Sequence, residues 1–296
     1  MKDFLTVRGL GRSDLETLID EADALRRDLD GGAVIERDLE GMCVANLFFE
    51  PSTRTRLSFD LAAQRLGAHV ITFDPERSST SKGESLRDTG LTVAAIGADI
   101  LVARHKEEGV PKLLAEWTGL PVVNAGDGAN EHPTQTLLDA LTLRRHFGSI
   151  EGLRMAIVGD IAHSRVAGGL TTAMPVLGAA VTLVGPQGWL PEESGCPISN
   201  DLDSILGDVD VVYLLRVQTE RGGVISDDYV ADFGFGAPRV ASLRPDAVVM
   251  HAGPLNRGVE ISDEVAESPR SLIAEQVRNG VPTRMAVLRA LARGRA

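Results

Sequence analysis

Eight short runs of apolar residues recur along this chain, and longer amphipathic stretches separate most of them. Runs that are rich in β-branched residues and apolar on both faces are typical of parallel strands, because crossover helices cover both sides of a parallel sheet. The pattern therefore predicts an α/β protein. The expected strands are Cys43–Phe49, His69–Phe73, Ile100–Ala103, Val122–Asn124, Met155–Val158, Val181–Val184, Val211–Leu215 and Ala247–Met250.

The length of 296 residues suits two domains with about four strands each. The boundary is expected at residues 147–152, after a long helix predicted over Pro133–His146. Ligands of such sheets bind beyond the carboxyl ends of the strands. We therefore expect two doubly wound parallel-sheet domains, 1–147 and 148–281, with the active site in the cleft between them. A final helix, from about Pro282 to Ala292, is expected to bring residues 282–296 back onto the first domain.

The composition excludes several classes of protein. The formal net charge is −12 and the arginines are dispersed, which argues against a nucleic-acid binder, although a local arginine cluster can still hold a small anion. No run is long and apolar enough to span a membrane, and the N-terminus lacks a secretory apolar region, so a cytoplasmic protein is expected. The two cysteines have no zinc-ligand spacing, and we expect neither a metal nor a cofactor.

The segment "FFEPSTRTR" places polar residues where a strand ends and a helix begins. Pro51 breaks the strand, Ser52 is a suitable N-cap, and Thr53, Arg54 and Thr55 fall in the first helical turn. The unpaired N–H groups of that turn form an anion site at the positive end of the helix dipole. A plain serine cap with exposed arginines is the alternative, but the dipole disfavours cations in a first turn, which favours a bound phosphate.

Two further polar groups follow strands of the first half. Arg104 ends an apolar run and is either a ligand contact or an edge arginine in an ion pair. In "NAGDGANEHPTQTLLD", His132 and Gln135 lie three residues apart at a helix start, where both could hold a small carbonyl or amide group. A capping or packing histidine is the alternative. Arg56, past the first turn of its helix, is expected to pair with Glu50.

The stretch "ERSSTSKGESLRDTG" has no apolar period and predicts a mobile loop over residues 76–83. It carries Lys82, which is either a solvated lysine or part of a lid or a group donated to a neighbouring subunit.

The second half repeats the placement of arginines after strands. Arg165 follows one strand, and Arg216 ends another with Gln218 and Arg221 just beyond, so two arginines could clamp a small dicarboxylate. The turn 251–254 ends the last strand, and its Gly-Pro is either a plain turn or a cis bond that aims carbonyls at a ligand.

Together these motifs resemble the aspartate/ornithine carbamoyltransferase family, most closely its aspartate-specific catalytic chains. The resemblance rests on "PSTRTR", "SKGES", "RH" after a strand, "HPTQTLLD", "GDIAHSR", "RVQTER" and "HAGPLNRGVEI", in order along nearly the whole chain. It implies an enzyme of pyrimidine biosynthesis, a homotrimer with shared active sites, and the substrates carbamoyl phosphate and L-aspartate. It leaves open whether the trimer joins regulatory chains or a dihydroorotase.

The resemblance also implies roles by motif position. The phosphate would be held by Ser52, Thr53, Arg54 and Thr55. Arg104 would bridge phosphate and carbonyl, His132 would bond the carbonyl oxygen, and Gln135 would hold the carbamoyl nitrogen. Ser78 and Lys82 would come from the neighbouring subunit. Aspartate would lie against Arg165, Arg216 and Gln218, while the carbonyls of Ala252 and Gly253, before Pro254, would accept from the carbamoyl amide.

The chain departs from the family pattern at two places. Ala252 stands where the family usually has proline, and Gly168-Gly169 replaces an Arg-Ser pair after Arg165. Both lie near the expected acceptor site, so a carbamoyltransferase with another amine acceptor stays an alternative. A non-catalytic scaffold homologue is a second alternative, but the phosphate-binding residues that it would be expected to lose are all present.

Overall fold

The computed structural model describes residues 1–218 and 227–294 of the chain. Arg221, which the sequence places just beyond Arg216 and Gln218, lies outside these residues. The chain divides into two compact units, one made of Met1–Leu141 with Val277–Ala296, the other of Thr142–Gln276. The boundaries expected from the sequence, after residues 147 and 281, lie a few residues further along the chain.

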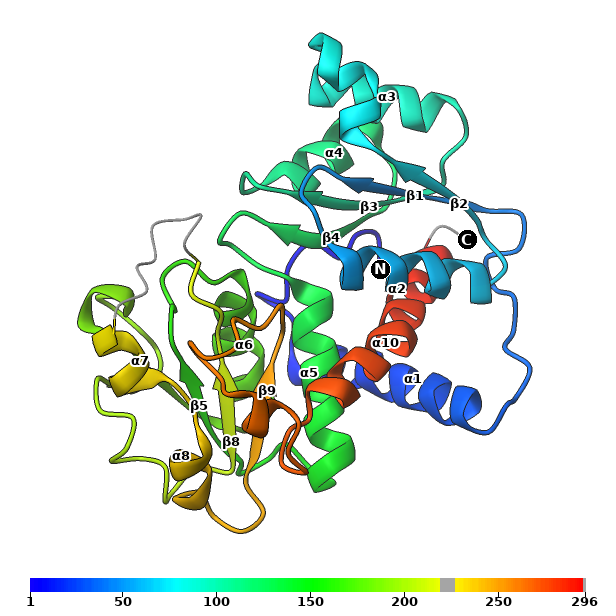
Figure 1. Ribbon diagram of the computed structural model, residues 1–296. Coiled ribbons are helices and arrows are strands. Elements are labelled where there is room, and N and C mark those ends of the chain that lie inside the picture. The colour runs from blue at the N-terminus through cyan, green and yellow to red at the C-terminus, as the bar shows by residue number, and fades with distance from the viewer. Residues whose placement is uncertain (219–226, 295–296) are drawn as a thin grey trace. The chain divides into compact units, whose positions relative to one another are not determined.

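Unit 1 contains a four-stranded parallel sheet in the order β2-β1-β3-β4 (Figure 1). Its strands are β1 (Cys43–Phe48), β2 (His69–Phe73), β3 (Ile100–His105) and β4 (Val122–Asp127). Each expected strand of this half is present, and β3 and β4 run two and three residues further than the apolar pattern because polar residues continue the pairing. β1, β3 and β4 are largely buried, as predicted. The prediction is wrong for β2, which has no buried residue because it lies at an edge of the sheet.

Helices cover both faces of this sheet. On one face, α3 (Leu86–Ala95) and α4 (Val110–Thr118) pack against Leu47, Leu101 and Ala103. On the other lie α2 (Thr53–Arg65) and part of α10 (Ile273–Arg293), as Figure 1 shows. α1 (Arg12–Asp30) contacts α10, since Arg289 Nη1 lies 2.6 Å from Glu21 Oε1. Unit 1 is therefore doubly wound.

Unit 2 contains a five-stranded parallel sheet in the order β7-β6-β5-β8-β9. Its strands are β5 (Arg154–Val158), β6 (Ala180–Val184), β7 (Ile198–Ser199), β8 (Val211–Leu214) and β9 (Val248–His251). The four predicted strands are confirmed, and β7 is an addition: its two residues pair with the end of β6. A strand of two residues carries no periodic pattern, so the sequence did not reveal it.

The second sheet is also covered on both faces. Ala156, Val212 and Val249 pack toward α7 (Asp227–Phe233) and α8 (Ala237–Ala241). The side chains between them along the strands point to the opposite face, where α6 (Arg165–Val176) lies (Figure 1). The short helix α9 (Asp263–Ala266) also belongs to unit 2, whereas the long helix α5 (Pro133–Phe147) lies mostly in unit 1, to which its residues 133–141 belong. The fold class predicted from the sequence, two doubly wound parallel α/β domains, is confirmed.

The predicted start of the final helix needs correction. α10 begins at Ile273, nine residues before the predicted start, and runs through Pro282. Proline removes one backbone hydrogen bond, but the buried side chains that follow it, Met285, Val287 and Leu288, hold the helix to its unit.

The expected loop at residues 76–83 instead forms two short 3-10 turns, Pro75–Arg77 and Ser79–Lys82. Side-chain bonds stabilise them: the Ser78 hydroxyl donates to the Pro75 carbonyl at 2.9 Å and accepts from the Thr80 N–H at 3.3 Å. Polar residues of this kind bond their own backbone, which is why the segment forms turns without an apolar period, while its predicted mobility stays a prediction.

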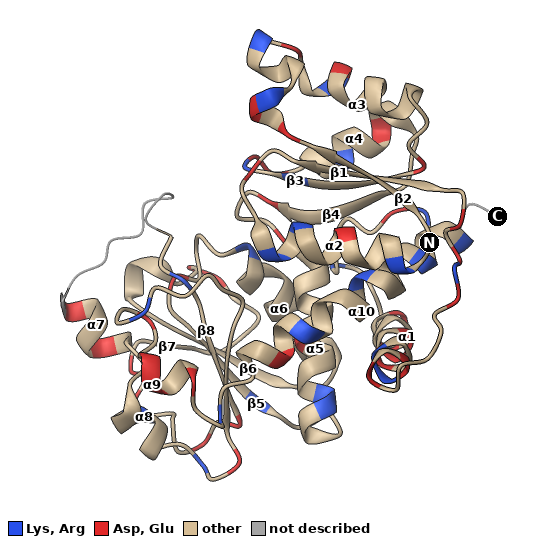
Figure 2. Cartoon of the chain, turned by 45° about the vertical axis from the view of Figure 1, so that its right-hand side comes forward, with Lys and Arg blue, Asp and Glu red and all other residues tan. Residues whose placement is uncertain are grey.

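Charged residues are spread over many elements of the chain, and Figure 2 shows no element on which Lys and Arg alone gather. Within the described ranges, 1–218 and 227–294, no helix is both long and apolar enough to cross a bilayer.

Candidate active site

The start of α2 is built as the sequence suggested. Ser52 is the N-cap residue with extended backbone angles, but its hydroxyl makes no capping hydrogen bond. Thr55 is buried, and its Oγ1 lies 3.4 Å from Nε2 of His132, at the entry to α5. Two segments far apart in the sequence thus meet at the carboxyl ends of β1 and β4.

Arg54 and the helix dipole make this terminus electropositive. The first-turn N–H groups carry the positive end of the dipole, and no acidic residue lies in that turn to offset it. Partial burial lowers the pKa of the Arg54 guanidinium, because desolvation disfavours the charged form. A bound anion would relieve that cost, which favours the anion site over a plain cap.

Arg104, at the end of β3, joins the same edge of the sheet. Its Nη1 donates to the Ala125 carbonyl and its Nη2 lies near Oε1 of Glu50, each at 3.4 Å. The predicted pair of Glu50 with Arg56 is therefore wrong, since Glu50 contacts Arg104 instead and Arg56 is exposed. Neighbouring strands bring residues 50 and 104 together, a contact that no local spacing reveals.

A buried carboxylate holds the loop that precedes His132. Glu131 accepts from the Thr6 hydroxyl at 2.6 Å, from the Val7 N–H at 2.8 Å and from Arg8 Nε at 3.0 Å. The N-terminal segment therefore fastens the residue next to His132.

A second buried carboxylate, that of Asp127, accepts hydrogen bonds at the start of the same loop. Asp127 accepts from Asn124 Nδ2 at 2.8 Å and from the Gly109 N–H at 2.9 Å. Asp127 therefore holds the start of the loop and Glu131 holds its end.

Gln135 follows His132 by one helical turn. Its Nε2 donates to Oδ1 of Asp139 at 3.0 Å, and both side chains are buried. Sequence reasoning singled out Gln135 and missed Asp139, although the spacing of four residues in "QTLLD" is a signal for a contact on one helix face.

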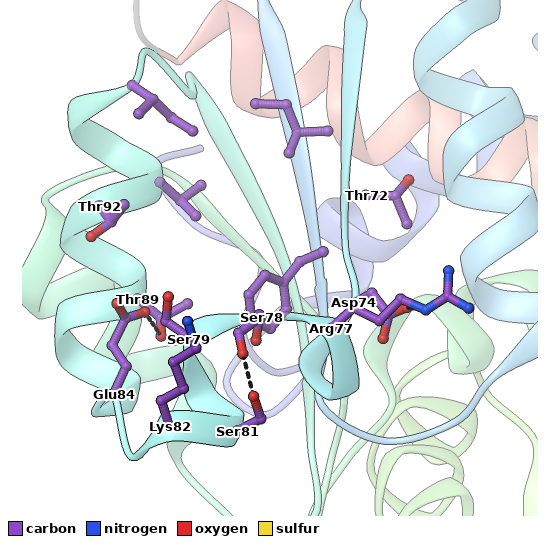
Figure 3. Close-up of a pocket in the computed structure, with 14 residues that line it drawn as sticks. Thr72, Asp74, Arg77, Ser78, Ser79, Ser81, Lys82, Glu84, Thr89 and Thr92 are labelled. Atoms are coloured by element: carbon purple, nitrogen blue, oxygen red, sulfur yellow. Dashed lines mark hydrogen bonds and ion pairs between the residues drawn. The ribbon is translucent and has the colours of Figure 1, made fainter.

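Ser78 and Lys82 lie elsewhere in unit 1. They line a cavity of about 650 Å³ beyond the exposed side of β2, together with Phe73, Thr89 and Ile96. Figure 3 shows Lys82 beside Glu84 and Thr89. Among the described residues, no hydrogen bond or ion pair joins Ser78 or Lys82 to the start of α2, so within one chain they do not belong to the site around Thr55.

In unit 2, Arg165 occupies the first position of α6. Ser164 caps this helix, accepting from the Ala167 N–H at 3.4 Å, and Arg165 is 8% exposed. The start of α6 thus repeats the arrangement at α2, with an arginine at the positive end of a helix. The uncharged Gly168-Gly169 pair lies in the next part of the same helix.

Arg216 and Gln218 lie together after β8. Arg216 Nη2 donates to Gln218 Oε1 at 3.1 Å, and the Gln218 N–H donates to Oδ2 of Asp160 at 3.0 Å. Asp160 is fully buried, and its other oxygen lies 2.6 Å from Nδ1 of His163. Asp160, which follows β5, therefore ties the end of one strand to the segment that follows another.

The turn after β9 contains a cis peptide bond between Gly253 and Pro254, as the sequence suggested. Nδ1 of His251 accepts from the Gly253 N–H at 2.7 Å, so Nε2 carries the proton and faces Oε1 of Glu260 at 3.2 Å. His251 and Glu260 are buried, and they hold the turn that carries Ala252. Neither had a predicted role.

The described part of the chain contains no group of three or more His, Cys, Asp or Glu side chains placed to hold a metal ion. The polar groups that do converge are hydrogen-bond donors and arginines at strand ends. Such an arrangement can bind and polarise anionic or carbonyl-containing small molecules.

Two family models match the chain. Residues 2–145 match the carbamoyl-P binding domain of aspartate/ornithine carbamoyltransferase, and residues 151–291 match its Asp/Orn binding domain. A protein of Acidothermus cellulolyticus described as an aspartate carbamoyltransferase catalytic subunit is 50% identical over 97% of this chain and 91% of its own length. A protein of Thermobifida fusca with the same description is 48% identical over 97% and 94%.

Solved structures agree with this match. The aspartate transcarbamoylase of Trypanosoma cruzi, in complex with carbamoyl phosphate and aspartate, has a TM-score of 0.89 at 33% identity and covers 98% of this chain and 95% of its own. An ornithine carbamoyltransferase from Pyrococcus furiosus has a TM-score of 0.88 at 28% identity, with coverages of 97% and 96%.

Proposed function

Because the chain belongs to the aspartate/ornithine carbamoyltransferase family, we propose that it transfers the carbamoyl group of carbamoyl phosphate to the amine of L-aspartate. The products are N-carbamoyl-L-aspartate and phosphate, in a step of pyrimidine biosynthesis. The observation that carries the proposal is the meeting of Thr55, at an electropositive helix start, with His132. The relatives described as aspartate carbamoyltransferases, at about 50% identity over most of the chain, favour aspartate as the acceptor.

Unit 1 binds carbamoyl phosphate. The phosphate lies at the start of α2, where the N–H groups and hydroxyls of residues 52–55 donate and Arg54 offers two parallel bonds. The carbonyl oxygen faces Thr55, His132 and Arg104, while the carbamoyl nitrogen faces Gln135. The conflict between a cation and the helix dipole is removed once the dianion is present.

Donors aimed at the carbonyl oxygen then drive the chemistry. The neutral amine attacks the carbamoyl carbon, a C–N bond forms, and negative charge develops on the carbonyl oxygen between Thr55, Arg104 and His132. The bond to the phosphate oxygen breaks, and the leaving phosphate takes the proton of the amine. Each donor on such an oxyanion contributes on the order of 3 kcal/mol, and alignment of two substrates supplies effective molarities of roughly 10⁵ M or more.

Unit 2 binds the acceptor. Arg165 and Arg216 hold the two carboxylates, and Asp160 keeps Gln218 beside Arg216. The carbonyls of Ala252 and Gly253, ahead of Pro254, accept from the carbamoyl amide. The His251–Glu260 pair supports that turn, which explains how alanine can stand at position 252.

The protein acts as a homotrimer in which Ser78 and Lys82 complete the site of a neighbouring subunit. Their position on the cavity beside β2, without a bond to the α2 start of their own chain, supports this assignment.

The phosphate site is tested with two arginines on one helix. In Arg54→Gln, kcat/KM should fall by a factor on the order of 10² and inhibition by inorganic phosphate should weaken, because a charged donor to the anion is lost. Arg56→Gln is the matched control, since Arg56 lies on the same helix past its first turn and its N–H already donates to the Ser52 carbonyl at 3.4 Å, and it should stay within about twofold of the wild type. Equal losses in both variants would refute the assignment.

The acceptor is tested by supplying carbamoyl phosphate with a panel of amines, L-aspartate and L-ornithine among them, and measuring phosphate release. Turnover with aspartate alone is expected. No turnover with aspartate, but turnover with another amine, would move the acceptor assignment while leaving the phosphate site intact.

A further inference from the structure

Gln135 has two chemically opposite faces, and the substrate requires only one of them. The side-chain amide carries an oxygen that accepts and a nitrogen that donates. The carbamoyl nitrogen of the substrate is a donor, so it is bound only if the amide oxygen points toward it. A glutamine turned the other way would set two donors against each other.

One carboxylate decides the orientation. Gln135 Nε2 donates to Asp139 Oδ1 at 3.0 Å inside the protein, where Asp139 is 0% exposed. An ionised carboxylate only accepts, so the nitrogen must face it and the oxygen must face away. Among the residues that the structure describes, none forms a hydrogen bond with Oε1 of Gln135, which leaves that oxygen for a ligand.

A buried arginine favours the ionised form of Asp139. Arg284, on α10, is 3% exposed, and its attraction to the Asp139 carboxylate opposes the effect of burial, which lowers the pKa of its guanidinium to about 9. Opposite charges stabilise each other's ionised form, so the attraction between Arg284 and Asp139 favours the carboxylate.

Arg284 is itself held against α2. Its guanidinium carbon lies 5.1 Å from the centre of the Phe59 ring, one helical turn beyond Thr55. Arg284 thus packs on Phe59 of α2, the helix that binds the phosphate, and attracts Asp139 of α5, the helix that carries Gln135.

We propose that Asp139 is a positioning residue that fixes the Gln135 amide with its oxygen toward the substrate, so that the enzyme selects an acyl phosphate bearing an amino group over one bearing a methyl group. This inference rests on the proposed function, which supplies the carbamoyl group that Gln135 faces. Asp139 does not touch the substrate and acts only through Gln135.

The test compares carbamoyl phosphate with acetyl phosphate, which has a methyl group in place of the amino group. Affinities are measured by calorimetry on the full chain without an acceptor amine. In Asp139→Asn the residue can donate or accept, so Gln135 is no longer fixed. The preference for carbamoyl over acetyl phosphate should then fall about tenfold, while the affinity for acetyl phosphate stays unchanged. Equal weakening of both ligands, or a preference like that of the wild type, would overturn the proposal.

A second background separates positioning from a structural effect. In Gln135→Leu the preference should already be lost, and adding Asp139→Asn should not lower it further. If Asp139→Asn alone does not fold, Asp139→Asn/Arg284→Gln also removes the buried charge of Arg284, and the same loss of preference is expected. Full preference in that folded double variant would also contradict the proposal.

The controls distinguish failure of the inference from failure of the proposed function. A wild-type chain that binds both acyl phosphates equally would overturn the inference alone. A wild-type chain that binds neither would overturn the proposed function, and the inference with it.

Discussion

Replacing Glu131 by glutamine should destabilise unit 1 through the N-terminal segment. The carboxylate is fully buried and receives three donors, at 2.6 Å from Thr6 Oγ1, 2.8 Å from the Val7 N–H and 3.0 Å from Arg8 Nε. Glutamine keeps the shape but turns one oxygen into a donor. Wherever the new NH2 group points, it faces a donor that the carboxylate had satisfied.

The magnitude follows from the partners. The least costly arrangement keeps the oxygen toward Val7 and sets the NH2 group against Thr6, whose hydroxyl can rotate. Both bonds then change from charge-assisted to neutral, a loss of about 1 kcal/mol each. Arg8 adds little, because its side chain is 57% exposed. We expect the free energy of unfolding to fall by about 2 to 3 kcal/mol, which corresponds to a Tm lower by roughly 4 to 10 °C.

Thermal melting followed by circular dichroism measures this loss. Glu116→Gln is the matched control: its side chain is 56% exposed and lies 4.0 Å from Lys112, so its Tm should hardly change. A double-mutant cycle with Thr6→Val should give a coupling of at least about 0.5 kcal/mol. Two results would show that the buried carboxylate does not hold the segment. One is a Tm of Glu131→Gln equal to that of Glu116→Gln, and the other is a double variant whose loss of free energy equals the sum of the two single losses.

Two further predictions concern the close packing at Gly185 and the burial of His105. A Cβ at Gly185 would lie 2.6 Å from the backbone oxygen of Gly159, so Gly185→Ala should lower the unfolding free energy by about 1 to 3 kcal/mol. Gly207→Ala, which meets no atom within 4 Å, is the control, and equal melting of the two would refute this reasoning. Burial lowers the pKa of His105, so below pH about 6.5 the unfolded chain binds a proton that the folded chain does not. Stability should therefore fall as the pH falls from about 6.5 through the folded pKa. His105→Asn, which keeps an acceptor for the Glu107 N–H, should lose less stability over that range in urea titrations; an unchanged pH dependence would contradict the assignment.

Much of the fold could be predicted because its signals are local. The run Ile100–Ala103 is apolar on both faces in the sequence, and the structure buries it in an inner strand of the first sheet. The strand β7 has two residues and no such signal. Pro282 predicted a helix start because proline is favoured there, whereas burial of the residues that follow it outweighed one lost hydrogen bond.

The candidate site likewise combines residues that have a local sequence signal with contacts that only folding creates. The sequence could identify Thr55 and His132 separately, since each opens a helix after a strand, and the structure brings them within 3.4 Å. It misassigned Glu50 to Arg56, because the true partner, Arg104, comes from another strand. Arg284 had no signal at all: its partner lies on a helix in the middle of the chain, and only folding brings them together.

The division of unit 1 between both ends of the chain determines when each part can be completed during synthesis. Residues 142–276 form unit 2 from one uninterrupted stretch, so all of its strands have been made before α10 is finished. Unit 1 has its strands early but lacks Arg284 and Arg289 until the chain beyond unit 2 has been made. On a ribosome, the half that is translated first should therefore mature last. Until then the buried face of α2 that includes Phe59 lacks the cation that packs on it, which leaves apolar surface of unit 1 open to aggregation during synthesis.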